Sequence, residues 1–140
     1  MTLAGGCHCG AVRYQLEWPA DQPIPARRCT CTYCTRFGGT WTSHPEARLA
    51  FECTASSVLG RYRFGTGTAD FCFCNSCGVM VAALDDHGGR LKAVVNVRTL
   101  DEFDSLAFEH ADSCFDGEAT DDRLQRRGRN WIPRVSFAQG

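Results

Sequence analysis

The residues best suited to chemistry in this sequence are its cysteines, because seven of the ten fall into three short clusters. The clusters are the N-terminal pair Cys7 and Cys9, the middle cluster Cys29, Cys31 and Cys34, and the third pair Cys74 and Cys77. Zinc binds thiolates in tetrahedral sets, and a set of four closes the coordination sphere whereas a set of three leaves one position open. The spacing therefore predicts two metal sites of different kinds.

The N-terminal and third pairs together supply four thiolates, which predicts a structural zinc site. Residues i and i+2 of a strand point to the same face, so Cys7 and Cys9 can converge on one ion. Gly78 directly follows Cys77 and permits the positive φ that a tight Cys-x-x-Cys turn tends to require. Structural zinc contributes about 10–16 kcal/mol in small peptides, so this site should govern folding. The alternative is that the four cysteines are reduced thiols of the core.

The middle cluster offers three thiolates, which predicts a catalytic or ligand-exchanging zinc. Three thiolates leave the site with a net charge near −1, which suits an incoming thiol better than the activation of water. Arg27, Arg28 and Arg36 flank the cluster and are either solvated surface charges or carboxylate-binding groups. We expect the three cysteines to be catalytic and Arg36 to bind the carboxylate of a thiol substrate.

Length and charge restrict the class of protein. The 140 residues predict a single domain spanning 1–140, and the net charge of −1 gives no electrostatic footprint for nucleic acid. The first nine residues lack the basic and apolar regions of a signal peptide, and the strongest apolar run, 79–84, is too short to cross a bilayer. We therefore expect a cytoplasmic protein without a membrane partner, whose cysteine clusters bind metal rather than form disulfides. The sequence does not indicate an oligomeric state.

Closely spaced glycines and short apolar runs predict an all-β fold of several small antiparallel sheets around the zinc sites, with few short helices. In 11–18, apolar and polar residues alternate as in a half-buried strand. Further strands are expected at 40–43, 48–52, 58–64, 69–73, 79–84, 91–97 and 106–110, and 79–84 with 91–97 should form a hairpin. Residues 21–25 read as a loop. Only 100–105 and 121–127 read as helical.

Three ordered motifs span most of the chain. They are Gly6-Cys7-His8-Cys9-Gly10, Cys29-x-Cys31-x-x-Cys34 followed by Gly38-Gly39, and Phe73-Cys74-x-x-Cys77-Gly78. They resemble the motifs of the glutathione-dependent formaldehyde-activating enzyme family. The resemblance covers about residues 4–110, and the segment 111–140 departs from the family pattern.

The resemblance implies an all-β fold with a structural zinc on the N-terminal and third pairs and a catalytic, labile zinc on the middle cluster. It also implies carbon–sulfur bond formation between glutathione and formaldehyde, giving S-(hydroxymethyl)glutathione.

The leading hypothesis is thus a zinc-dependent carbon–sulfur lyase acting on a thiol such as glutathione and a small aldehyde such as formaldehyde. One alternative is a non-catalytic zinc-binding module for protein contacts. Another is a redox protein in which Cys31 and Cys34 cycle through a disulfide. The remaining thiols, Cys53, Cys72 and Cys114, are expected to lie outside both metal sites.

Overall fold

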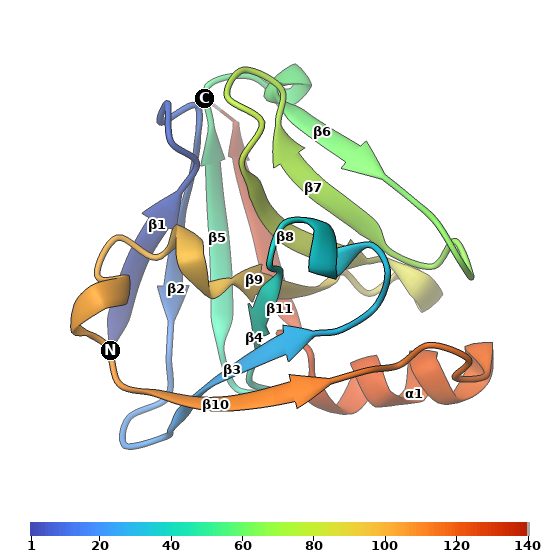
Figure 1. The fold of residues 1–140 in the computed structure, drawn as a ribbon. Coiled ribbons are helices and arrows are strands. Elements are labelled where there is room, and N and C mark those ends of the chain that lie inside the picture. Colours follow the sequence, from blue (N-terminus) through green and yellow to red (C-terminus); the bar gives the residue numbers. More distant parts are fainter. Residues whose placement is uncertain (140) are drawn as a thin grey trace.

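The computed structural model describes residues 1–139 and contains two sheets that share one core (Figure 1). The smaller sheet has the strand order β1 (Thr2–Gly6), β2 (Val12–Glu17), β5 (Arg48–Cys53) and β11 (Arg134–Gln139). The larger sheet has the order β10 (Phe108–Ser113), β3 (Ile24–Cys29), β4 (Thr40–Thr42), β9 (Lys92–Asn96), β8 (Met80–Asp85), β7 (Asp70–Cys74) and β6 (Leu59–Tyr62).

One α-helix, α1 (Thr120–Asn130), lies at the end toward which β3 and β10 both run (Figure 1). Short 3-10 turns complete the described part of the chain. They are Cys34–Arg36, Ser56–Val58, His87–Gly89, Val97–Thr99 and Phe103–Ser105.

The core follows from strand alternation in the smaller sheet. Val12, Tyr14 and Leu16 of β2 are buried, and the residues between them are less buried or exposed. The neighbouring strand β5 contributes Leu49 and Phe51, both 0% exposed. Because successive side chains point to opposite faces of a sheet, this period of two directs one face of the sheet toward the larger sheet.

The all-β class is confirmed, as are the predicted hairpin of β8 and β9 and the C-terminal helix. Most strand pairs are antiparallel as expected, but β10 pairs with β3 and β11 pairs with β5 in parallel. Parallel pairing needs a long connection between the two strands. The strands β10 and β11 come late in the chain and pair with strands from its first half, so such a connection is available.

Three strands were not predicted from the sequence, namely β1, β3 and β11. Strand β3 was missed because it contains Pro25 and two arginines, and its start falls in the expected loop 21–25. Pro25 is tolerated because β4 pairs with β3 only at Arg27 and Arg28, so that beyond this short overlap one edge of β3 is free of ladder bonds. The expected helix at 100–105 was wrong, since only the 3-10 turn Phe103–Ser105 forms there.

A buried ion pair fixes α1 to the larger sheet. Arg127 donates to Asp85 at 3.0 Å and to Thr68 at 2.8 Å, and the side chains of Arg127 and Asp85 are 7% and 0% exposed. Directly after the helix, Ile132 exchanges two backbone hydrogen bonds with Ala93 of β9, at 2.8 and 3.0 Å. The helix is thus fixed to β8 and β9 near its C-terminal end.

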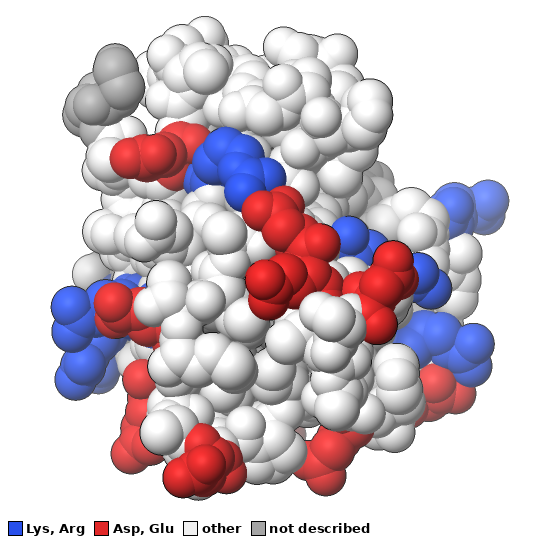
Figure 2. All heavy atoms as spheres, turned by 90° about the vertical axis from the view of Figure 1, so that its left-hand side faces the viewer, with Lys and Arg blue, Asp and Glu red and all other residues white. Residues whose placement is uncertain are grey.

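The surface carries charges of both signs. On the face at the β1 side of the molecule, basic side chains lie next to acidic ones, and the acidic ones gather near the middle of the view (Figure 2). The mixture of both signs on this face matches the near-neutral net charge of −1. Within residues 1–139, no helix has the length and apolarity needed to cross a membrane.

Removal of Asp85 should strongly destabilise the fold. Asp85→Ala leaves the Arg127 guanidinium buried without its counterion, and breaking a buried pair in this way costs about 3–5 kcal/mol. Arg13→Ala is the control, because its ion pair with Asp101 is exposed and such pairs contribute about 0–1 kcal/mol. Urea unfolding of both variants measures the difference. Equal stability losses would show that the Asp85 pair does not anchor α1.

Candidate functional site

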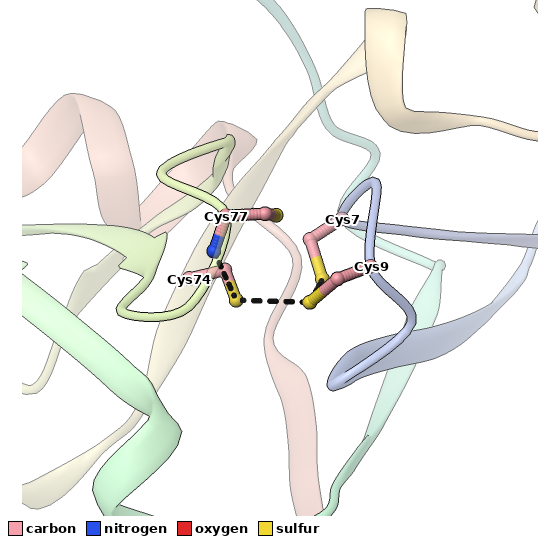
Figure 3. Close-up of side chains that lie close together, drawn as sticks. All are labelled: Cys7, Cys9, Cys74 and Cys77. Atoms are coloured by element: carbon pink, nitrogen blue, oxygen red, sulfur yellow. Dashed lines mark hydrogen bonds between the residues drawn. The ribbon is translucent and has the colours of Figure 1, made fainter.

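The structure brings four cysteines from distant parts of the chain together. Cys7 and Cys9, from the loop between β1 and β2, face Cys74, the last residue of β7, and Cys77, from the turn that follows β7 (Figure 3). Their four Sγ atoms lie within 4.8 Å of one another, with 3.8 Å between Cys7 and Cys9 and 3.7 Å between Cys9 and Cys74. This four-cysteine site could hold a metal ion.

Backbone N–H groups point at the sulfurs of the four-cysteine site. Val12 donates to Cys7 Sγ at 3.3 Å, and Ser76 donates to Cys74 Sγ at 3.3 Å. Hydrogen bonds from the backbone N–H groups of Val79 and Cys9 lower the pKa of Cys77 to about 6. Donors aimed at sulfur stabilise thiolate, which is the form that binds metals.

Turns rather than strands make the cysteines converge. Cys7 and Cys9 lie just beyond β1, so the expectation that they share one face of a strand was wrong. Gly10 and Gly78, each directly after a cysteine, have φ values of 86° and 81°. The positive φ expected of Gly78 is therefore confirmed, and these glycines allow both turns to close tightly.

The three-cysteine site consists of Cys29, Cys31 and Cys34, with all three Sγ atoms within 4.8 Å of one another. Cys29 ends β3, Cys31 lies in the following turn, and Cys34 begins a 3-10 turn. The backbone N–H of Cys34 donates to Cys31 Sγ at 3.3 Å. The turn is tied back by Gly39, which donates to the carbonyl of Cys34 at 2.9 Å. This set could also hold a metal ion.

Within the three-cysteine site the pKa values of Cys29 and Cys34 are shifted in opposite directions. The hydrogen bond from Cys34 lowers the pKa of Cys29 to about 6, and the same contact together with burial raises the pKa of Cys34. Cys29 is half-buried, whereas Cys34 is 1% exposed.

A cavity of about 490 Å³ opens beside the three-cysteine site and has all three cysteines in its wall. The size falls within the range of about 300–1,000 Å³ that is usual for small-molecule sites. The apolar part of the wall includes Trp41, Phe64, Phe71, Val94 and Trp131. The four-cysteine site contributes no residue to this cavity.

The three arginines that flank the middle cluster lie in different surroundings. Arg27 is half-buried and lines the cavity, whereas Arg28 is exposed and pairs with Asp112 at 2.8 Å. Arg36 is exposed and is not among the residues that line the cavity. Burial, and less strongly the positive charge of Arg126, lower the pKa of Arg27.

Sequence reasoning missed three further arginines in the cavity wall, Arg123, Arg126 and Arg127 of α1. The spacing of 123, 126 and 127 places them on one helix face, which was a usable signal. What the sequence did not indicate is that this face meets the end of β3. Of the remaining thiols, Cys53, Cys72 and Cys114 belong to neither cysteine set, as expected, and Cys72 is fully buried.

Comparisons with known proteins agree with the cysteine motifs. The sequence profile of the family described as "Glutathione-dependent formaldehyde-activating enzyme" matches residues 2–115. A protein of Halomonas elongata that carries this designation as a provisional name is 46% identical over 39 residues, which is 28% of this chain and 24% of that protein. The chain thus matches only about a quarter of that relative's length.

A solved structure has the same fold. The crystal structure of a Rhodobacter sphaeroides protein superposes with a TM-score of 0.52 and 24% sequence identity, over 97% of this chain and 100% of that chain.

Loss of one cysteine should lower the melting temperature strongly in the four-cysteine site and only slightly in the three-cysteine site. Cys77 and Cys29 are both half-buried, so replacing sulfur by a hydroxyl disturbs packing to a similar extent in either place. Cys77→Ser should lower the melting temperature by about 10 °C or more, since about 1 kcal/mol corresponds to roughly 2–8 °C in domains of this size. Cys29→Ser should keep the wild-type melting temperature within about 3 °C.

Metal content completes this test. Elemental analysis should give two metal ions per wild-type chain and one per Cys29→Ser chain. If Cys29→Ser unfolds while Cys77→Ser melts like the wild type, the structural and open sites have been assigned the wrong way round.

Proposed function

Because the chain belongs to the glutathione-dependent formaldehyde-activating enzyme family, we propose that it joins a thiol such as glutathione to a small aldehyde such as formaldehyde. The product is an S-hydroxymethyl thiol adduct, and in the reverse direction the reaction is that of a carbon–sulfur lyase. The proposed catalytic residues are Cys29, Cys31 and Cys34.

The observation that carries this proposal is the opening of the three-cysteine site onto the cavity. The three cysteines line a space large enough for a small molecule to reach the sulfurs, and the four-cysteine site contributes no residue to that cavity. Formaldehyde alone would fill a small part of about 490 Å³. The remaining volume leaves room for a thiol the size of a tripeptide.

The donor sets fit zinc, and we propose one zinc ion in each. Four thiolates suit a closed structural site, and three suit a site with one exchangeable position. A zinc ion held by the middle cluster would supply a Lewis acid that favours the thiolate form of a bound sulfur. Since all ten cysteines are free thiols, we further propose a reducing compartment, the cytoplasm.

The proposed reaction is an addition in which nothing is oxidised or reduced. The thiol sulfur forms a bond to the carbonyl carbon, and the π electrons of the C=O bond move to the oxygen. The proton that leaves the thiol is balanced by the proton that the new hydroxyl group gains. The protein contributes by holding both reactants close together, and the apolar rings of Trp41, Phe71 and Trp131 limit the access of water.

Catalysis should depend on the middle cluster. The wild-type protein should speed the approach of glutathione and formaldehyde to equilibrium, and Cys29→Ser should return it to the uncatalysed rate. Cys114→Ser is the control, because Cys114 is an exposed thiol outside both cysteine sets. Nuclear magnetic resonance of ¹³C-labelled formaldehyde follows both species. A full rate in Cys29→Ser would exclude the proposed mechanism.

The two alternatives have their own signatures. If the wild-type protein binds two metal ions but does not accelerate the reaction of glutathione with formaldehyde, a non-catalytic zinc-binding module is favoured. A redox protein would instead show a reversible Cys31–Cys34 disulfide and release metal on oxidation.

A further inference from the structure

The cavity has an arginine-rich wall in addition to its cysteines. Arg27 comes from β3, and Arg123, Arg126 and Arg127 come from α1. The family profile ends at residue 115, so α1 lies outside the part of the chain that the family match covers. The three helix arginines are therefore a feature of the present chain that the match does not account for, whereas Arg27 lies within the matched residues.

Most of the positive charge on α1 is already compensated inside the protein. Arg127 is paired with Asp85 at 3.0 Å. Arg126 donates three hydrogen bonds of 3.1–3.2 Å to the carboxylate of Glu118, and Arg123 lies 3.9 Å from the same carboxylate. The helix arginines thus shape and close the wall, and a ligand would have to compete with Glu118 for them.

Arg27 is different, because its charge has no carboxylate partner within 4.0 Å among residues 1–139. Its Nη1 donates to the hydroxyl of Ser43 at 3.1 Å, which is a neutral acceptor. Arg27 is nevertheless half-buried in the cavity wall, which Arg126 also lines. A partly desolvated cation beside another cation is unfavourable unless an anion joins them.

The geometry of strand β3 places Arg27 next to the three-cysteine site. Arg27 and Cys29 are two residues apart on β3, and both line the cavity, whereas Arg28 between them points outward to Asp112. A strand rises about 3.3 Å per residue, so the two inward positions are roughly 7 Å apart along the backbone. An anion on Arg27 is therefore a few bonds away from a group at the three-cysteine site.

We propose that Arg27 is the specificity-determining residue of this cavity and binds a carboxylate of the thiol substrate. The identification of that substrate as a thiol rests on the proposed function, but the anion subsite rests on Arg27 itself. The arrangement selects thiols that also carry a carboxylate, as glutathione does, over neutral thiols. A role of Arg36 in the same recognition stays a prediction that the same experiment tests.

The experiment uses S-methylglutathione, which keeps both carboxylates but has no free thiol. Isothermal titration of the wild-type protein should detect binding, and Arg27→Gln should weaken it about 10- to 100-fold, the usual effect of losing a charge-assisted hydrogen bond. Arg28→Gln is the matched control, because it removes an adjacent arginine that faces outward. The diethyl ester of S-methylglutathione should bind wild type and Arg27→Gln equally.

Unchanged affinity in Arg27→Gln, or equal losses in Arg27→Gln and Arg28→Gln, would overturn the proposal. So would a failure of S-methylglutathione to bind the wild-type protein. A loss confined to Arg36→Gln would move the subsite to Arg36 and overturn the assignment to Arg27. If S-methylglutathione binds through Arg27 while glutathione and formaldehyde react no faster than without protein, the subsite stands and the proposed function fails.

Discussion

The buried contact between Arg127 and Asp85 is the interaction on which the cavity depends. It joins the only α-helix among the described residues to the end of β8, and both side chains are almost fully out of water. Taking two charges out of water is costly, and only close pairing offsets that cost. A pair with this geometry therefore favours the one position of α1 in which Arg127 and Asp85 are in contact over positions that separate them. With α1 fixed, its arginines form a wall facing the end of β3, and the space between them becomes a site.

The two cysteine sets have the same type of ligand but different surroundings, and the roles proposed for them follow from those surroundings. The four-cysteine site joins the loop after β1 to the turn after β7 and has no part in the cavity. A metal there would stabilise the fold by about 10–16 kcal/mol, which is comparable with the whole stability of a domain. The three-cysteine site lies in a single turn, where a metal closes only a short loop. A metal at this site would therefore influence folding less, and its open position would allow ligand exchange, as the proposed function requires.

The sequence predicted the features that depend on local spacing. The three-cysteine set, the positive φ of Gly78, the alternating strand at β2 and the β8–β9 hairpin all follow from residues close together in the chain. The four-cysteine set joins distant residues, and it was predicted because two cysteine pairs complete the four ligands of a structural zinc site. Strand β3 was missed because Pro25 and two arginines disfavour a strand locally, and tertiary pairing with β10 and β4 overrides that preference. The arginine wall was missed for a related reason, since its position depends on where α1 packs.

Electrostatics explains why such a wall belongs beside three thiols. A substrate carboxylate and the negatively charged cluster would repel each other by about 2 kcal/mol for each pair of unit charges roughly 7 Å apart, at an effective dielectric constant of about 20. A cavity lined by thiolates and apolar rings alone would therefore exclude anionic thiols. Arg27 lies two residues before Cys29 on β3 and lines the same cavity, so in the role proposed here its positive charge would offset this repulsion. Cysteines from the part of the chain that matches the family lie in one cavity with arginines that come partly from outside it. This combination is what the proposed substrate, both thiol and anion, would require.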